Sequence, residues 1–257
     1  MPNVLGNDDT MSQLATASNY GFSAISLDDL ESSEYTLASI VVDLSGSVHG
    51  FKDALEKCVS TTVKSCKDSP REENLLLRVV GFNTQLNEIH GFRLLSEIDP
   101  AEYDGTFHPG GGTALFDAAQ SAVEASDTYG QMLVDQEYSA NAVIYIITDG
   151  ADSGASVATA KSVKKAIEQA RLDENLESIA VILIGVGYDS SWAKSYLDNF
   201  KTEADITQFV DMTKLFNESN PEKALAKLAG YVSKSISSTS QALSSGTSTA
   251  ASSQLTF

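Results

Sequence analysis

IVVDLSGS, residues Ile40–Ser47, is the stretch that decides the fold of this chain. Its apolar half ends a strand expected over 37–42, where the residues are those of a strand buried on both faces. Its second half places Asp43, Ser45 and Ser47 at alternate positions on the loop that leaves the strand. The glycine between the serines lets the backbone turn into a helix. One acid and two hydroxyls arranged in this way are half of an oxygen site for a hard metal ion.

The rest of the chain alternates between strand and helix patterns. Buried strands are expected over 75–82, 142–147 and 179–184, a short strand over 85–90 and a last strand over 206–210. Helices are expected from Val48 through Cys66, over 115–123, 157–172 and 191–200, and from Pro221 onward. This alternation predicts an α/β fold: a doubly wound, mainly parallel central sheet with helices on both faces and one antiparallel edge strand, 85–90. Trp192 is expected to pack on the core.

Composition divides the chain into three segments. Residues 1–34 are polar, aperiodic and acidic toward their end, and we expect an N-terminal arm or docking extension there. Residues 35–235 form the expected domain. Residues 236–257 are rich in Ser and Thr and poor in large apolar residues, which predicts a tail that is disordered or ordered by a partner.

Length, charge and cysteines restrict the class of protein. A chain of 257 residues is long enough for one large α/β domain or two small ones. The net charge of −18 argues against nucleic acid and anionic membranes as partners, since a phosphate-facing surface needs clustered Lys and Arg. Cys58 and Cys66 fall in one predicted helix, too far apart for a disulfide within it, which suits a reducing compartment. With no leader pattern and no long apolar run, we expect a cytoplasmic protein, or a virion component if a phage encodes it.

Two later segments supply further oxygen atoms at the same place in the predicted fold. Thr113 follows the triple glycine 110–112, and Asp149 follows the strand 142–147. Ligands of a doubly wound sheet bind beyond the carboxyl ends of its strands, where both residues would join the loop 43–47. Two carboxylates and three hydroxyls, without a thiol or an imidazole, favour Mg²⁺ or Mn²⁺ over Zn²⁺.

The order and the spacing of these motifs carry a family resemblance. The motifs are Asp43-x-Ser45-x-Ser47, then Gly111-Gly112-Thr113, then Thr148-Asp149-Gly150. Over about residues 35–235 the chain resembles the von Willebrand factor type A domain family. The resemblance implies a metal-ion-dependent adhesion site made of Asp43, Ser45, Ser47, Thr113 and Asp149. It further implies that the three hydroxyls bind the ion directly, that the two acids bind directly or through water, and that a carboxylate of a partner protein fills the remaining position.

The residues around the five positions can be interpreted as ordinary structural elements as well as functional ones. Gly112, His108 and Asp152 are expected at the partner-binding rim, although ordinary surface loops explain His108 and Asp152 equally well. Taken alone, the run Asp43–Ser47 is typical of a helix-capping turn. The glycine loop lacks the Lys-Ser/Thr ending of a nucleotide-binding loop, and the histidines show no zinc spacing.

These features favour a non-enzymatic module that engages an acidic residue of a partner protein through the bound cation, within an intracellular multiprotein assembly of bacterial, archaeal or phage origin. The resemblance implies an AAA+ ATPase or assembly subunits as partners. The alternative is a structural component of a phage particle or another large assembly, docked through its terminal arms. A Mg²⁺-dependent phosphatase is disfavoured, because Ser45 stands where a haloacid dehalogenase-type enzyme needs its second Asp.

Overall fold

The computed structural model describes residues 11–14, 20–188, 190–218 and 220–245. The strands are β1 (Met11–Leu14), β2 (Phe22–Ile25), β3 (Glu34–Asp43), β4 (Leu75–Phe82), β5 (Leu86–Leu94), β6 (Ser139–Thr148), β7 (Ile179–Gly185) and β8 (Gln208–Asp211). The α-helices are α1 (Lys52–Lys67), α2 (Leu115–Val134), α3 (Ala160–Leu172), α4 (Ser191–Glu203), α5 (Thr213–Glu218) and α6 (Pro221–Ser245). Short 3-10 helices span Leu27–Asp29, Gly46–Phe51, Glu72–Asn74, Leu95–Glu97 and Pro100–Tyr103.

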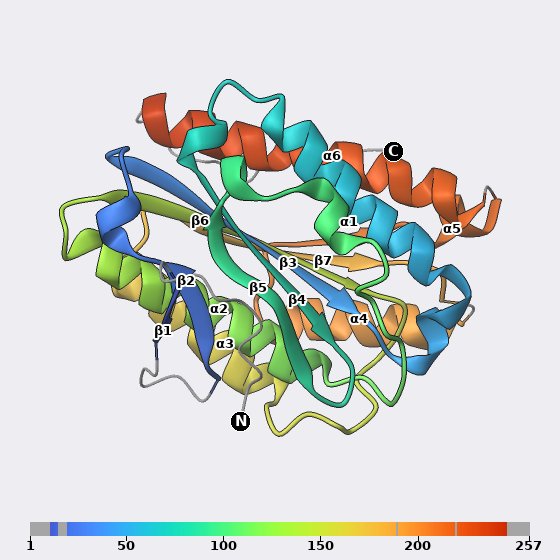
Figure 1. The fold of residues 1–257 in the computed structure, drawn as a ribbon. Coiled ribbons are helices and arrows are strands. Elements are labelled where there is room, and N and C mark those ends of the chain that lie inside the picture. The colour runs from blue at the N-terminus through green and yellow to red at the C-terminus, as the bar shows by residue number, and fades with distance from the viewer. Residues whose placement is uncertain (1–10, 15–19, 189, 219, 246–257) are drawn as a thin grey trace.

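The described strands form one sheet in the order β1-β2-β5-β4-β3-β6-β7-β8 (Figure 1). Within this order, the neighbours in the part β4-β3-β6-β7-β8 are all parallel, so the carboxyl ends of these five strands lie at a common edge. In this register Val42 of β3 pairs with Gly81 on one side and Ile147 on the other. β3 and β6 are buried at nearly every position, which explains their continuous apolar sequence. The predicted α/β fold class is confirmed.

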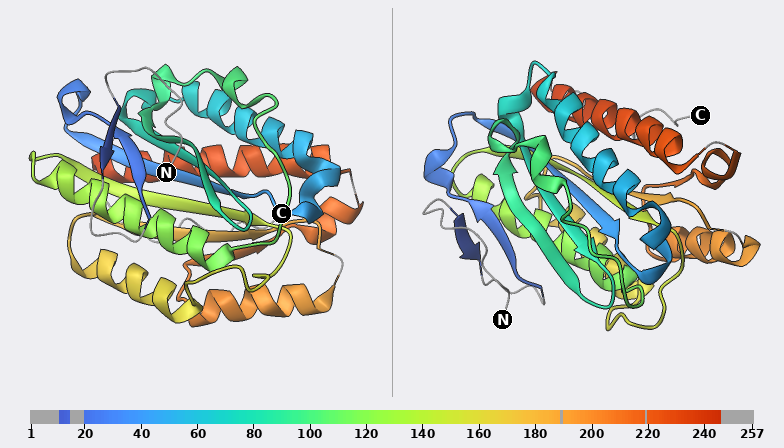
Figure 2. Two further views of the ribbon diagram at one scale, coloured as in Figure 1. Left: turned by 60° about the horizontal axis from the view of Figure 1, so that its bottom comes forward. Right: turned by 45° about the vertical axis from the view of Figure 1, so that its right-hand side comes forward.

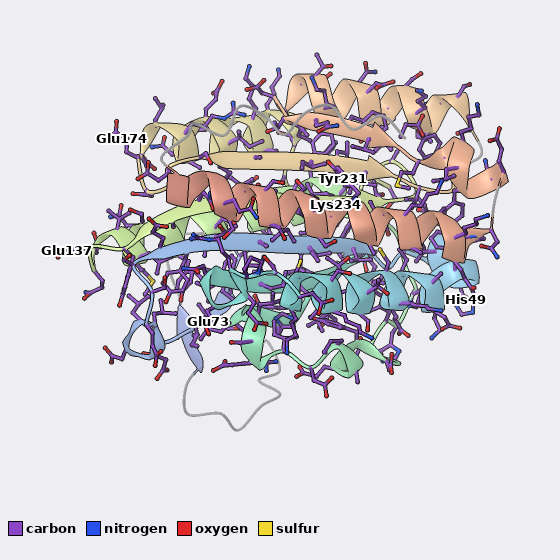
Figure 3. The ribbon with its side chains drawn as sticks, turned by 90° about the horizontal axis from the view of Figure 1, so that it is seen from above. His49, Glu73, Glu137, Glu174, Tyr231 and Lys234 are labelled. Carbon is purple, nitrogen blue, oxygen red and sulfur yellow. The ribbon has the colours of Figure 1, made fainter. Side chains whose placement is uncertain are left out.

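Helices cover both faces of this sheet. α2, α3 and α4 lie on one face, and α1, α5 and α6 lie on the other (Figures 1 and 2). Viewed from above, α1 and α6 run side by side over the strands (Figure 3). The same view separates the two edges of the sheet, because His49 lies at the carboxyl edge whereas Glu137 and Glu174 lie at the opposite one.

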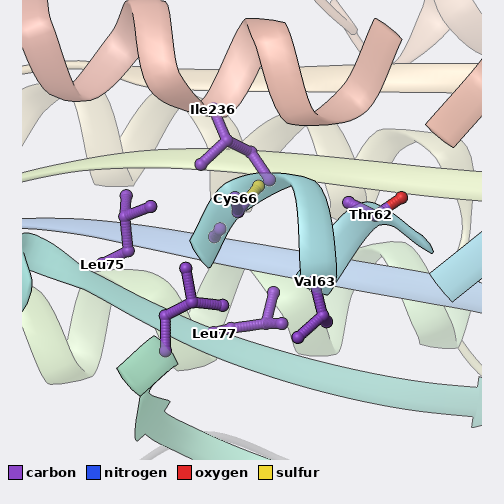
Figure 4. A pocket seen from close by; sticks show the side chains of 8 residues that line it. Thr62, Val63, Cys66, Leu75, Leu77 and Ile236 are labelled. Atoms are coloured by element: carbon purple, nitrogen blue, oxygen red, sulfur yellow. The ribbon is translucent and has the colours of Figure 1, made fainter. Parts of the chain in front are cut away.

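A small apolar cavity lies between α1, α6 and the sheet (Figure 4). It is lined by Ala38, Thr62, Val63, Cys66, Leu75, Leu77, Leu95 and Ile236. The Thr62 hydroxyl donates a hydrogen bond to the Cys58 carbonyl, so the polar atom of the lining is already paired within α1. Cys58 and Cys66 share α1, as predicted, and both are buried free thiols.

The segment expected to be an N-terminal arm contributes to the sheet. β1 pairs with β2 in antiparallel register, and β2 lies parallel to β5. β5 is antiparallel to β4, as predicted for 85–90, but the prediction that it is the edge strand is wrong. The Ser23 hydroxyl donates to the Glu88 carboxylate, which also pairs with the buried Arg78. This polar network attaches the short strand β2 together with its buried side chains Phe22, Ala24 and Ile25, and hydrophobic periodicity does not reveal the polar contact.

Residues 236–245 are helical, which contradicts the tail predicted to begin at 236. α6 continues without a break to Ser245. Ile236 is buried, Arg71 Nε donates to Ser240 Oγ at 3.0 Å, and Asn141 Nδ2 donates to the Thr239 carbonyl at 3.0 Å. Polar contacts thus hold a Ser/Thr-rich helix whose composition suggests disorder. Residues 246–257, and 1–10 at the other end, lie outside the described residues.

Two further observations concern the helices. Trp192 does not pack on the core as predicted, because its position in the first turn of α4 leaves it 65% exposed. No helix in the described part of the chain is long and apolar enough to span a bilayer.

Candidate metal centre

The loop after β3 turns above the carboxyl edge of the sheet. Asp43, the last residue of β3, is 1% exposed. Its Oδ1 accepts a hydrogen bond from the Ser45 backbone N–H at 2.8 Å, which closes the turn. Gly46 then begins a 3-10 helix that leads into α1. Ser45 is buried and Ser47 is exposed, so the two hydroxyls run from the interior toward the surface.

Hydrogen bonds join this loop to the one after β6. Ser45 Oγ and Ser47 Oγ lie 2.9 Å apart, and Ser47 Oγ donates to Asp149 Oδ1 at 2.9 Å. Asp149 follows β6, and β6 is the parallel neighbour of β3, so the two loops leave the sheet side by side. The structure therefore places Asp43, Ser45, Ser47 and Asp149 together.

Thr113 lies on an adjoining loop. The Gly46 N–H donates to the Gly111 carbonyl at 3.1 Å, which ties this loop to the first. Gly111 has a φ of 75°, a conformation that glycine adopts without strain. Thr113 is buried, and Ser153 holds its backbone from both sides: Ser153 Oγ accepts from Thr113 N at 2.8 Å, and Ser153 N donates to Thr113 O at 2.9 Å. Ser153 thereby positions the backbone of Thr113.

The three predicted rim residues differ in their surroundings. A side chain at Gly112 would overlap the Ser153 hydroxyl, so glycine is needed where the two loops meet. The Asp152 carboxylate accepts hydrogen bonds from Gly154 N at 2.7 Å and from the Ser156 hydroxyl, and it thereby organises its own loop. His108 is exposed. Their role toward a partner stays a prediction.

Thr148 is a site residue that sequence reasoning missed. Its hydroxyl donates to Asp43 Oδ2 at 2.7 Å, and the Gly150 N–H donates to the same hydroxyl at 3.2 Å. Thr148 thereby fixes the second oxygen of the buried carboxylate. Its signal in the sequence is its place at the end of β6, directly before Asp149.

Burial dominates the electrostatics of the two acids. Desolvation raises the pKa of Asp43 to about 6, although hydrogen bonds from Thr148 and Ser45 act in the opposite direction. The charged neighbour that acts on Asp43 is a second carboxylate, Asp149, which raises its pKa further. Burial also raises the pKa of Asp149, against the hydrogen bond from Ser47 that lowers it. Two desolvated acids, of which Asp149 acts on Asp43 as a like charge, favour a bound cation.

The donor atoms suit a hard divalent cation. Among the described residues no group of three or more His, Cys, Asp or Glu side chains could hold a metal ion, so a cation at this place depends on hydroxyls as well as acids. Such all-oxygen surroundings fit Mg²⁺ or Mn²⁺, which also retain water ligands.

Solved structures of other proteins share the arrangement of this chain. The PilB minor pilin from Streptococcus sanguinis superposes with a TM-score of 0.55 at 18% identity, covering 84% of this chain and 64% of that one. The pilus adhesin SpaC from Lactobacillus rhamnosus GG gives 0.56 at 11% identity, over 82% and 31%. Proximal thread matrix protein 1 from the mussel byssus gives 0.50 at 17% identity, over 80% and 47%.

The fold is von Willebrand factor type A-like. At these identities the likeness concerns the fold alone. The chain spans less than two thirds of each of these three proteins. No protein-family model matches the sequence of this type A-like domain, and no curated protein sequence matches it either.

Proposed function

We propose that this type A-like domain is a protein-binding module that works through a divalent cation. Asp43, Ser45, Ser47, Thr113 and Asp149 would hold Mg²⁺ or Mn²⁺ at the carboxyl edge of the sheet. The bound ion would offer its open coordination position to a Glu or Asp of a partner protein.

One observation carries this proposal: Ser45 and Ser47 link two buried or partly buried acids, Asp43 and Asp149. The Ser45 backbone N–H donates to Asp43, the hydroxyls of Ser45 and Ser47 lie 2.9 Å apart, and the Ser47 hydroxyl donates to Asp149. Two acids brought together in this way, with Asp149 acting on the buried Asp43 as a like charge, are costly without a positive charge. A divalent cation supplies that charge and relieves the cost. A helix cap alone needs neither the burial of Asp43 nor the approach of Asp149.

The chemistry of the ligands favours binding over catalysis. Neutral hydroxyls neutralise none of the charge of the ion, so the ion attracts an external carboxylate strongly. A phosphatase of the haloacid dehalogenase type would need a carboxylate at position 45 for proton transfer, and Ser45 cannot supply it.

Capture of partners from the cells that make the protein tests this function. Wild type is compared in Mg²⁺ and in chelator, beside Thr113→Ala and the matched control Thr202→Ala, an exposed change at the far end of α4. The proposal expects partners that wild type and Thr202→Ala retain in Mg²⁺ and that chelator or Thr113→Ala releases. Partners retained equally under all conditions would contradict the metal bridge.

The identity of the partner protein depends on more than the metal site. An AAA+ ATPase or an assembly subunit as partner, and the cytoplasm or a virion as the location, remain proposals that come from the sequence. The captured proteins would decide among them.

A further inference from the structure

A row of aromatic side chains leads from α4 to the start of α2. The rings of Trp192 and Tyr196 have centroids 5.6 Å apart, and those of Tyr196 and Phe116 are stacked with centroids 6.2 Å apart. Phe116 also packs on Phe200, whose centroid is 4.8 Å away and which is buried. The row is therefore anchored in the core at one end and 65% exposed at Trp192.

The anchored end of the row adjoins the candidate metal centre. Phe116 lies three positions after Thr113, and its backbone N–H donates to Ser156 Oγ at 3.1 Å in the loop that carries Asp152 and Ser153. The same Phe116 N–H lies 3.4 Å from Asp152 Oδ2, so this loop contacts the start of α2 at the anchored end of the aromatic row. One loop thus contacts both the backbone of Thr113 and the aromatic row.

Trp192 on α4 is one exposed large apolar residue, and Val157 on this loop is a second. Val157 is 92% exposed, whereas its backbone is held in place by a hydrogen bond. The backbone N–H groups of Val157 and Ala158 donate to the buried carboxylate of Asp117, at 3.1 Å and 2.7 Å. Asp117 follows Phe116 in α2, so the first turn of that helix holds Val157 directly and is linked to Trp192 through Tyr196.

We infer that Trp192, Tyr196 and Val157 form a docking surface for a large apolar side chain of the same partner segment whose carboxylate binds the metal ion. The inference rests on the proposed function, since the metal-bound carboxylate brings that segment to this edge of the sheet. Of the exposed large hydrophobic residues, Trp192 and Val157 lie at the carboxyl edge, where α4 and α3 begin.

The occupant is a segment with one acid, a large aliphatic or aromatic residue a few positions away, and otherwise neutral or basic side chains. The net charge of −18 disfavours a partner that carries additional acids beyond the one bound to the ion. The aromatic row provides a flat apolar surface that a large apolar side chain would cover.

Selection from a displayed library of random short peptides tests this surface. The full chain is used in Mg²⁺ and in chelator, as wild type, Trp192→Ser, Val157→Ser and Leu172→Ser. Leu172 is the matched control, because it is 74% exposed at the far end of α3. Synthetic peptides from the selected set, with the apolar residue kept or changed to Ser, give affinities by calorimetry.

Wild type and Leu172→Ser should select peptides with an acid and an apolar residue at a preferred spacing. Trp192→Ser and Val157→Ser should keep the acid and lose the apolar preference. Changing the apolar residue of the peptide to Ser should weaken binding to wild type about tenfold or more, and binding to Trp192→Ser only slightly.

Three other results overturn the inference. Selection of an acid without an apolar neighbour, or an apolar preference that persists in both Trp192→Ser and Val157→Ser, would refute the docking surface and leave the metal bridge standing. Selection without any Mg²⁺-dependent acid would refute the proposed function, and the docking surface with it.

Discussion

Asp43→Asn separates the stability of the fold from the binding of metal. The Asn side chain keeps an oxygen to accept from Ser45 N, and its amide can donate to the Thr148 hydroxyl. The Thr148 hydroxyl can then donate to the Gly150 carbonyl, which is already 3.1 Å away. The variant therefore removes the buried charge and preserves the hydrogen bonds.

The expected gain follows from the pKa of Asp43. Because burial raises this pKa from 3.8 to about 6, the ionised carboxylate destabilises the folded state by roughly 3 kcal/mol in the absence of metal. The unfolded chain releases this proton near pH 3.8 and the folded chain near pH 6. The contribution of Asp43 to stability therefore decreases as pH rises between these two values and is constant above them.

Urea unfolding in chelator measures this difference directly. The free energy of unfolding of Asp43→Asn should match that of wild type near about pH 4 and exceed it by about 1 to 3 kcal/mol near about pH 8. Saturating Mg²⁺ should stabilise wild type, by about 2.7 kcal/mol at a hundred times the dissociation constant, and stabilise the variant much less. A variant less stable than wild type at high pH in chelator would refute this account of Asp43.

Three further predictions concern the surrounding structure. Gly112→Ala should destabilise the domain by about 1 to 3 kcal/mol in thermal unfolding, because its methyl group meets the Ser153 hydroxyl. Burial lowers the pKa of His90 to about 4, so wild type should lose up to roughly 3 kcal/mol relative to His90→Gln as pH falls from 6.5 toward 4, measured by urea unfolding of both proteins. Asp117→Ala leaves the N–H groups of Val157 and Ala158 without their acceptor, and should speed proteolysis of the loop 150–159 as well as cost about 2 to 4 kcal/mol. Each prediction would be contradicted by one result. These results are unchanged melting of Gly112→Ala, a pH profile of His90→Gln that runs parallel to that of wild type, and undiminished protease resistance of Asp117→Ala.

The central part of the fold follows from the sequence because burial leaves a strong signal there. β3 and β6 are buried on both faces, so each has an unbroken apolar run, and β4 begins and ends at the predicted residues. The acids and hydroxyls of the site could be located for the same reason, since each follows one of these runs or the glycine loop.

Contacts between distant polar groups leave no periodic signal, and they contribute to two of the remaining differences. Hydrogen bonds from Ser23 to Glu88 help to attach β2, beside its buried apolar side chains, and bonds to Arg71 and Asn141 help to hold the last turns of α6, where Ile236 is buried. Trp192 was misplaced because its type predicts burial, whereas its position in the first turn of α4 leaves it at the surface.

The most direct test of the metal centre is a crystal structure of the protein soaked in Mn²⁺, recorded with anomalous scattering. The account predicts one strong anomalous peak among the hydroxyls of Ser45, Ser47 and Thr113, next to Asp43 and Asp149, and no such peak in Thr113→Ala. A saturating soak that leaves this position without a peak, or places the ion elsewhere, would contradict the central claim.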